Sequence, residues 1–527
     1  MNTYPALLFH AVDTNARQAP ENTAFEFRGE ILSNTQLAQK SNQLANLLLS
    51  LGIEKGARVG IFSRQSLHVP VAIFGIQKTG AAYAPIDPKT PARRLLTIIQ
   101  ELGIEVLITQ DTVLAELNIV LELGHNNRHF PLRVLVGLTT ASSETVDTYS
   151  WQSVFTQASS PPMVDIDTHD LAYVMTTSGS TGTPKGIMHT HYSGLAYARL
   201  SARTYDVTAR DCLGNFVPLH FDISTFAYFV GPLSAARVVL IPEEYLLFPT
   251  SLVDLVEEQE ISIWYSAPYP LIEIALNDLF TRHNLKCLRW VKFGGESMHP
   301  KYLQLLMQQL PDCSFSNVYG PAEVNQCTYH HFVTPPTSNE PLPLGKVWAE
   351  TDYLVINEEG EIVTDGTEGE LLIHSSTMMQ GYWNNATLNR AAFYNHSNAR
   401  KYYRTGDLTY TNDKGELVFA GRKDRQVKLR GYRIELDEVE SVLITHPIVL
   451  EAAALLSKNS QNQWQIHAWV SLYTDKELSE DELIAHAGAS LPAYATPRSI
   501  AFLKLLPRTT TGKIDRLALP QVTDLTR

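Results

Sequence analysis

Cysteine is scarce in this sequence, and the few residues present follow no pairing pattern. The chain has 527 residues and 4 cysteines, none of them in a CxxC spacing: Cys212, Cys287, Cys313 and Cys327. This absence argues against a disulfide framework and against a cysteine zinc site. The N-terminus also lacks a basic region followed by an apolar run and a cleavage site, so no signal peptide is expected. We therefore expect four reduced thiols in a cytoplasmic protein.

Long apolar runs and clusters of positive charge are missing as well. Arg, Gln or Glu interrupts every apolar stretch before the roughly 18 residues that a spanning helix needs, so no membrane association is expected. The 42 Lys+Arg against 55 Asp+Glu give a formal net charge of −13. No basic stripe or tail is visible, which makes nucleic acid an unsuitable partner. The remaining composition, 44% hydrophobic and 18% charged, is that of a globular protein able to bury a large core.

Helical and strand patterns alternate along most of the chain. Leucines recur at helical spacing between positions 37 and 51, after the capping candidates Ser33 and Asn34 and before Gly52. A further helix is expected at 251–259. Short apolar runs predict strands at 58–62, 237–241, 261–265, 288–293 and 352–356. This alternation predicts an α/β fold whose large N-terminal body has mixed or parallel sheets flanked by helices.

The clearest domain boundary lies near residues 421–428. A hairpin pattern at 408–420 precedes it. An α+β pattern follows it, with helices expected at 435–445 and 479–490 and strands at 450–457 and 465–473. We expect an N-terminal domain of residues 1–423 and a small, mobile C-terminal domain of residues 424–527, since about 105 residues suffice for a domain.

The strongest local motif is at residues 171–186, with the sequence LAYVMTTSGSTGTPKG. An apolar strand leads into a loop rich in glycine and hydroxyl groups, and Lys185 adds a positive charge. Glycines let backbone N–H groups approach an anion, so the loop suits polyphosphate. It is not a Walker A loop, because Pro precedes Lys185 and Gly follows it. The alternative is a flexible surface turn.

This loop resembles the phosphate-binding motif of the adenylate-forming superfamily, which includes acyl-CoA synthetases, luciferases and the adenylation domains of nonribosomal peptide synthetases. Further motifs of that superfamily follow in order along nearly the whole chain, and their variants are most similar to amino-acid adenylation domains. They are KTGAAYAPID at 78–87, FDIS at 221–224, GGE at 294–296, NVYGPAE at 317–323, GELLI at 369–373, GY at 381–382, YRTGD at 403–407, GRKDRQVK at 421–428, GYRIE at 431–435, LPAYATP at 491–497 and TGKIDR at 511–516.

The resemblance implies an AMP-forming ligase that uses ATP and Mg²⁺. Tyr319 could stack on a purine and Glu323 could ligate the metal, although a strand-end tyrosine and a solvated glutamate are equally compatible with these residue types. Asp407, assisted by Arg422, would bind the ribose. Ala322 replaces the usual hydroxyl and removes one phosphate contact. The implied ATP-binding set is Thr177, Ser178, Gly179, Ser180, Thr181, Gly182, Lys185, Gly294, Gly295, Glu296, Asn317, Tyr319, Gly320, Glu323, Asp407, Arg422 and Lys513.

Catalysis is expected from Lys513, Lys185 and Glu323. The resemblance places Lys513 between the substrate carboxylate and the α-phosphate, where its charge would stabilise the transition state. By its local sequence alone Lys513 would be a solvated loop lysine. Asp424 matches the family's domain hinge or is an ordinary linker charge. Lys428 and Gly431 match the loop that serves thioester formation, where glycine would let a pantetheine arm pass.

The substrate pocket implied by the resemblance centres on Asp222, which would hold an ammonium group or cap a helix. The pocket positions are Asp222, Ile223, Phe226, Tyr265, Lys292, Gly294, Val318, Gln326 and Cys327, closed by Lys513. Lys292 interrupts an apolar strand. It could neutralise a substrate carboxylate or pair with Asp222, or it is solvated if the alignment is off by one. These positions favour a polar or acidic amino acid, or a β-amino acid.

The predicted reaction is ATP-dependent conversion of an amino acid to aminoacyl-AMP with release of pyrophosphate. The aminoacyl group would then pass to the phosphopantetheine thiol of a separate carrier protein, or to CoA. The chain ends eleven residues after Arg516 without a carrier site, so a free-standing ligase for nonribosomal peptide synthesis or related secondary metabolism is expected. The alternatives are an acyl-CoA synthetase acting on a non-amino acid and a catalytically inactive nucleotide-binding protein.

Overall fold

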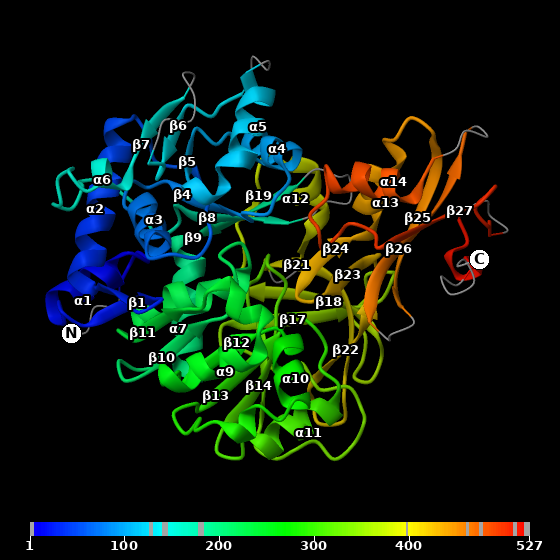
Figure 1. Cartoon of the computed structure of the whole chain (residues 1–527). Helices are drawn as coiled ribbons and strands as arrows, with labels where there is room; N and C mark the ends of the chain where they lie inside the picture. The colour runs from blue at the N-terminus through cyan, green and yellow to red at the C-terminus, as the bar shows by residue number, and fades with distance from the viewer. Residues whose placement is uncertain are drawn as a thin grey trace.

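The computed structural model describes residues 5–125, 130–139, 146–177, 184–396, 399–459, 463–473, 478–509 and 514–520. A large α/β body holds most of the chain, and a smaller α+β domain lies against one side of it (Figure 1). The predicted fold class is confirmed.

The first sheet of the body has the strand order β19-β9-β8-β4-β3-β5-β6-β7. Its strands from β8 to β7 run parallel, while β8–β9 and β9–β19 are antiparallel pairs. The bounds are β3 (Arg58–Phe62), β4 (Ala82–Ile86), β5 (Val106–Ile108), β6 (Val134–Val136), β7 (Asp147–Tyr149), β8 (Leu171–Thr177), β9 (Lys185–Thr190) and β19 (Gly381–Tyr382).

The second sheet has the order β16-β15-β14-β13-β12-β10-β11-β1-β2. Its central strands are parallel, and their register places Tyr265, Lys292 and Ser316 side by side on neighbouring strands. Side chains in such a row share one face of the sheet. The bounds are β1 (Thr23–Phe27), β2 (Glu30–Ser33), β10 (Cys212–Asn215), β11 (Arg237–Leu240), β12 (Ile263–Ser266), β13 (Trp290–Gly294), β14 (Ser314–Tyr319), β15 (Thr328–Phe332) and β16 (Lys346–Val347).

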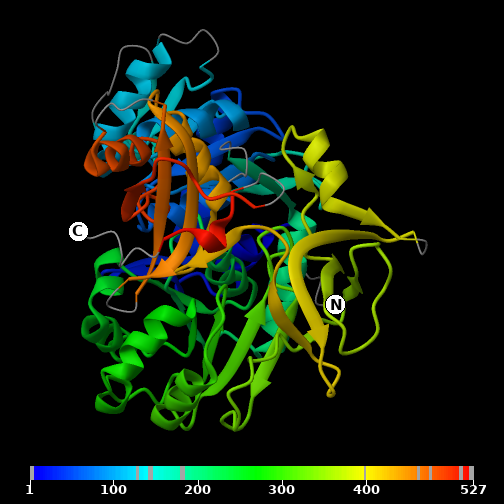
Figure 2. The ribbon, with the colours of Figure 1, turned by 90° about the vertical axis from the view of Figure 1, so that its right-hand side faces the viewer.

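An antiparallel sheet completes the body and leads into the small domain (Figure 2). Its strands are β17 (Thr351–Ile356), β18 (Gly369–Ser375), β20 (Phe393–Asn395), β21 (Lys401–Thr411) and β22 (Leu417–Arg422). The small domain consists of the hairpin β23 (Gln426–Leu429) and β24 (Tyr432–Glu435), followed by α13 (Leu436–Ile444), β25 (Val449–Lys458), β26 (Trp464–Leu472), α14 (Glu480–Gly488) and β27 (Ser499–Phe502).

Helices cover the faces of the two large sheets, as the alternating pattern predicts (Figure 1). The second helix begins with the predicted cap: the Ser33 hydroxyl accepts from Gln36 N and the Gln36 side chain accepts from Ser33 N. The helices of the body are α1 (His10–Gln18), α2 (Asn34–Ser50), α3 (His68–Gln77), α4 (Ala92–Leu102), α5 (Leu114–His125), α6 (Trp151–Val154), α7 (His191–Thr204), α8 (Gly231–Leu233), α9 (Pro249–Glu258), α10 (Pro268–Leu276), α11 (Pro300–Gln309) and α12 (Ala386–Ala392).

The small domain has its own hydrophobic core, which includes Ile434, Val439, Leu443 and Leu483. A separate core is what an independently moving domain requires, although the boundary at 423/424 stays a prediction. The four cysteines are free thiols. Within the described ranges no helix is long and apolar enough to cross a bilayer, and the cytoplasmic location likewise stays a prediction.

Candidate active site

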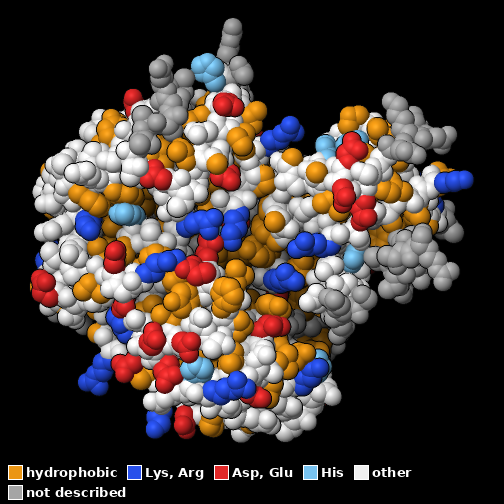
Figure 3. All heavy atoms as spheres, in the orientation of Figure 1, with side chains coloured by type: hydrophobic (Ala, Val, Ile, Leu, Met, Phe, Trp, Pro, Cys, Tyr) orange, Lys and Arg blue, Asp and Glu red, His pale blue; other side chains and the backbone are white. Residues whose placement is uncertain are grey.

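A cleft runs between the body and the small domain. Lys and Arg side chains gather beside apolar ones along this junction on the face shown in Figure 3. Both parts of the chain contribute to the lining. The body provides Asp87, Arg94, Thr176, Thr177, Phe221, Asp222, Ile223, Tyr265, Gly295, Val318, Gly320, Asp407 and Arg422, and the small domain provides Gln426, Lys428, Gly431, Tyr432, Arg433 and Tyr494.

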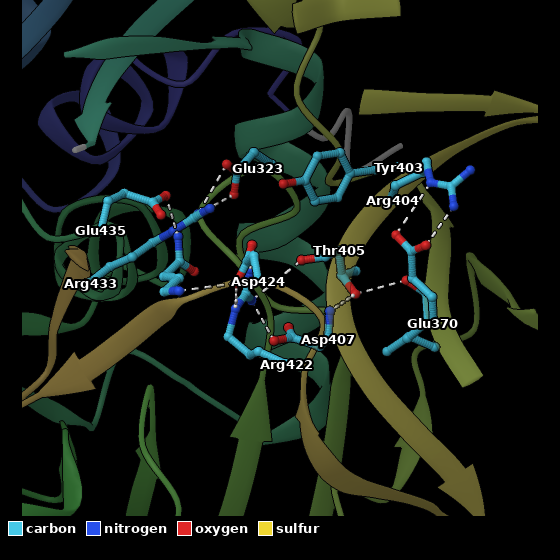
Figure 4. Close-up of polar contacts among 12 residues, drawn as sticks. Glu323, Glu370, Tyr403, Arg404, Thr405, Asp407, Arg422, Asp424, Arg433 and Glu435 are labelled. Carbon is cyan, nitrogen blue, oxygen red and sulfur yellow. Dashed lines mark hydrogen bonds and ion pairs between the residues drawn. The ribbon is translucent and has the colours of Figure 1, made fainter. Parts of the chain in front are cut away.

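Asp407 is the centre of a buried polar network at the end of the body (Figure 4). One carboxylate oxygen accepts from the Tyr319 hydroxyl at 2.5 Å, and the other accepts from Arg422 Nη1 at 2.5 Å. Arg422 also donates to Asp424 at 2.6 and 2.7 Å. Burial alone would raise the pKa of Asp424, but the hydrogen bonds and charge of Arg422 outweigh it and lower that pKa. The predicted ribose residues and the predicted hinge are thus one connected group.

Glu323 is completely buried and forms an ion pair across the domain junction (Figure 4). Arg433 Nη1 lies 3.0 and 2.7 Å from its two carboxylate oxygens, and the Tyr382 hydroxyl donates to it at 2.8 Å. Burial would raise the pKa of Glu323, but Arg433 outweighs this effect and lowers the pKa to about 2. Glu323 is therefore ionised, as a metal ligand must be.

The predicted phosphate loop is described only at its two ends. Thr177 ends β8 and pairs with Lys185, which begins β9. Lys185 Nζ lies 3.9 Å from the carboxylate of Glu435, which also accepts from Gln426 at 2.6 Å. The residues between the strands lie outside the described ranges: Ser178, Gly179, Ser180, Thr181 and Gly182.

The hairpin β23–β24 of the small domain enters the cleft. Gly431 N donates to the carboxylate of Glu296, and a Cβ added at Gly431 would lie 3.4 Å from Ala267. Lys428 lines the same cleft, and burial lowers its pKa. Two residues predicted for thioester formation are thus at the site in this orientation.

Lys513 lies outside the described residues. On either side of it in the sequence, Arg508 pairs with Glu451 and Arg516 pairs with Glu440, both within the small domain. Neither arginine is among the residues that line the cleft.

Asp222 lines the cleft together with Ile223, Tyr265 and Val318. The helical turn η2 (Asp222–Ser224) begins at this residue and Phe221 occupies the cap position, so the interpretation of Asp222 as a helix cap is wrong. Its carboxylate accepts from Ile223 N at 2.9 Å, and among the described residues it forms no ion pair. Burial raises the pKa of Asp222 to about 6. A cationic ligand would supply the missing charge.

Close backbone packing shapes the floor of the cleft at its glycines. A Cβ at Gly294 would lie 2.4 Å from Val318 O, and one at Gly320 would lie 2.0 Å from Asn325 O. Gly295 has φ +84°, which disfavours other residues. Asn317, in contrast, donates its amide to Pro343 O at 2.8 Å, a contact within the fold.

Lys292 corrects two sequence-based alternatives. It is completely buried, so it is not a solvated lysine, and it forms no ion pair with Asp222. Its Nζ lies instead 4.1 Å from the ring centre of Tyr205, 3.7 Å from that of Phe226 and 4.2 Å from that of Tyr265. Two further predicted pocket residues, Gln326 and Cys327, are also buried: Gln326 contacts the Tyr205 hydroxyl, whereas Cys327 Sγ lies 3.5 Å from Tyr319 O.

Sequence reasoning missed the roles of Arg433, Glu435 and Tyr382. All three lie within motifs that the sequence displays, but no role was assigned to them. Arg433 and Glu435 are two residues apart on a strand, where alternate side chains share a face. That spacing could have indicated a pair of charges directed at the body.

Comparison with known proteins gives a consistent set of matches. Residues 12–383 match the AMP-binding enzyme family, and residues 438–513 match the AMP-binding enzyme C-terminal domain. An L-proline–[L-prolyl-carrier protein] ligase of Pseudomonas fluorescens is 30% identical over 501 residues, covering 95% of this chain and 96% of that protein.

Longer relatives match along nearly the whole chain. Bacitracin synthase 1 of Bacillus licheniformis is 31% identical over 98% of this chain, but the chain spans only 9% of that protein. It spans between 6% and 38% of the peptide synthases it matches. Among solved structures, the Vibrio cholerae adenylation domain AlmE, in complex with glycyl-adenosine-5'-phosphate, has a TM-score of 0.83 at 23% identity, covering 98% of each chain.

Proposed function

We propose that this chain, which belongs to the AMP-binding enzyme family, is an AMP-forming adenylation ligase. It would activate an amino acid and transfer it to the phosphopantetheine thiol of a separate carrier protein. Asp222 is the observation that carries the choice of an amino acid. Its carboxylate lines the cleft and forms no ion pair among the described side chains. Burial keeps its pKa raised although the charges of Lys428 and Arg433 oppose this effect, and an ammonium group would supply a direct partner. The relative named as a prolyl-carrier protein ligase supports the choice of acceptor.

In the first half-reaction, a carboxylate oxygen of the amino acid would attack the α-phosphorus of ATP. The bond from this phosphorus to the bridging oxygen of pyrophosphate breaks as the acyl phosphate bond forms. Asp407 and Arg422, which line the cleft, would hold the ribose, and Tyr319 would hold the base. We assign Lys513 to the space between the two reacting anions, where its charge would offset their repulsion.

Mg²⁺ would offset phosphate charge in this step. Glu323 fits the role of its protein ligand, because its carboxylate is buried and ionised. No cluster of three acidic, His or Cys side chains exists among the described residues, so phosphate oxygens and water would complete the coordination. Arg433 would have to leave Glu323 for a metal to bind.

In the second half-reaction, the thiol would lose its proton to solvent and its sulfur would attack the acyl carbon. The bond from this carbon to the phosphate oxygen would break, and AMP would leave with the bonding electron pair. The orientation described here suits this step. The β23–β24 hairpin is in the cleft, Arg433 neutralises Glu323, and Gly431 leaves space beside Ala267 for a narrow chain. Rotation about the segment at Asp424 would exchange this hairpin for Lys513.

The test is amino-acid-dependent exchange of labelled pyrophosphate into ATP, followed by mass spectrometry of a carrier protein or CoA offered as acceptor. The panel contains polar, acidic, hydrophobic and β-amino acids together with matched acids that lack the amine. We expect exchange only with amino acids, and loss of at least about 100-fold in Lys513→Ala. Exchange with the amine-free acids and transfer to CoA would instead establish an acyl-CoA synthetase.

A further inference from the structure

We propose that Lys292 binds a carboxylate on the side chain of the substrate, so that the amino acid activated is an acidic one. This inference rests on the proposed function and narrows it from amino acids in general to those with a second carboxylate. It depends on the position of Lys292, its missing partner and the aromatic rings around it.

Lys292 is buried next to Tyr265, a residue of the cleft wall. The parallel register places it beside Tyr265 on β12, and Tyr265 lines the cleft together with Asp222 and Val318. Lys292 is on β13, between β12 and β14, and is not itself among the residues that line the cleft. Its Nζ lies 4.2 Å from the centre of the Tyr265 ring, so a ligand that displaced this ring would meet the ammonium group.

No residue of the described chain supplies a counter-charge to Lys292. Its Nζ is buried and has no hydrogen-bond partner, and it forms no ion pair. The groups around it are uncharged: the Tyr205 hydroxyl is hydrogen-bonded to Ser316 Oγ at 3.1 Å, and the ring of His331 stacks on Tyr205. A buried charge is normally paired, so the missing anion is one that the ligand provides.

Three aromatic rings make the position suitable for a cation. The faces of Tyr205, Phe226 and Tyr265 lie within 4.2 Å of Nζ, an arrangement that attracts an ammonium group. Burial acts in the opposite direction and lowers the pKa of Lys292. His331 adds no positive charge near pH 7, because burial lowers its pKa to about 4. A carboxylate that binds next to Lys292 would raise its pKa again and so favour the protonated, charged form.

A second polar group stands beside the same rings. Gln326 contacts the Tyr205 hydroxyl, and its side-chain oxygen has no hydrogen-bond partner. An amide in this state can turn to donate to a carboxylate. The proposed ligand is thus an amino acid with an ammonium group and a distal carboxylate. Asp222 would bind the ammonium group, and Lys292 with Gln326 would bind the carboxylate. The Tyr265 ring must rotate aside to admit that carboxylate.

The decisive measurement is kcat/KM for pyrophosphate exchange with aspartate, glutamate and β-linked acidic amino acids, each compared with its neutral amide. We expect an acid to exceed its amide by at least about 100-fold, since a site built around a polar partner rejects a ligand that lacks it. Lys292→Met, which keeps the length of the side chain, should remove this preference, and Lys292→Arg should retain part of it. Lys301→Met is the matched control, because Lys301 is exposed on α11 and should leave both values unchanged.

A readout apart from turnover is calorimetric titration with the acidic amino acid in two buffers that differ in ionisation enthalpy. Wild-type protein should take up protons on binding near pH 8, and Lys292→Met should not. The inference would be overturned if the enzyme preferred a neutral amino acid and Lys292→Met left this preference unaltered. Lys292 would then serve to close a shallow pocket. The amino-acid ligase assignment would survive that result. Exchange with no amino acid at all would overturn the proposed function itself.

Discussion

Among the described residues two lysines, Lys78 and Lys292, are buried almost completely, and their surroundings differ in one respect. Lys78, just after α3, directs Nζ to Asp13 Oδ1 at 2.7 Å and to Asn42 Oδ1 at 2.6 Å. Lys292 directs Nζ to three aromatic rings and to no oxygen in the described part of the chain. Burial lowers the pKa of both, but at Lys78 the charge of Asp13 opposes the effect. A lysine that stabilises the fold has its partners within the fold, whereas Lys292 lacks them.

The largest effect is expected where the partnered lysine is removed. Lys78→Met leaves Asp13 and Asn42 facing an apolar side chain, and we expect it to lower the free energy of unfolding by about 3 kcal/mol. Urea titration of the body, followed by tryptophan fluorescence, measures this loss. If Lys78→Met left the midpoint of the urea titration unchanged, Lys78 would not stabilise the fold, and the contrast drawn with Lys292 would be wrong.

Arg433 is a partnered cation of a different kind, because its partner Glu323 belongs to the other domain. Arg433→Met should slow thioester formation by about 30-fold, since Glu323 would be left buried and unpaired in this orientation. Pyrophosphate exchange, which does not need this pair, should change less than threefold by the same reasoning. Equal losses in both half-reactions would show that the pair serves general stability instead. Single-turnover loading of the carrier separates the two steps.

Asp222 is the acidic counterpart of Lys292, because its buried carboxylate forms no ion pair among the described residues, although the charges of Lys428 and Arg433 act on it. Its pKa is raised to about 6 by burial, so its carboxylate is protonated as pH falls through that value. Because the ammonium group requires the ionised form, KM for the amino acid should be constant above pH 7 and rise about tenfold per pH unit below the pKa. Asp222→Asn should abolish this pH dependence of KM for the amino acid. As a control, KM for ATP in the wild type should not change over the same pH range.

The smallest effect is expected from removing the unpartnered lysine. Lys292→Met replaces an isolated buried amine with an apolar side chain, so the free energy of unfolding should rise by about 1 kcal/mol. The same urea titration measures it. A loss comparable with that of Lys78→Met would show that Lys292 has a structural partner after all.

Sequence reasoning predicted much of this molecule because its strongest signals are local. The Ser33 cap of α2 and the strand Arg58–Phe62 depend on neighbours within a few residues, and both form as expected. Some strand ends moved by about two residues: the run 261–265 predicts a strand that is observed as Ile263–Ser266. The order of the motifs then indicated the family.

The surroundings of Lys292 could not be predicted in the same way. They combine Tyr205, Phe226 and Tyr265 from three separate elements, and only the parallel register of β12 and β13 brings the last of these beside Lys292. Periodicity within one strand does not specify which strand lies next to it. The pairing of Glu323 with Arg433, 110 positions later in the chain, escaped prediction for the same reason.

The turn between β23 and β24 has a consequence for how this protein can change. Arg430 and Gly431 both have positive φ, at 54° and 84°, the geometry of a two-residue hairpin turn. The turn fixes Lys428 opposite Arg433 and Gln426 opposite Glu435. Inserting one residue there would shift the register of β24 by one position, so that Arg433 and Glu435 would turn away from the body and toward the core of the small domain, where Ile434 now packs. The length of this turn and the charges of Arg433 and Glu435 therefore depend on each other, and a change in the turn length would turn both charges away from the body.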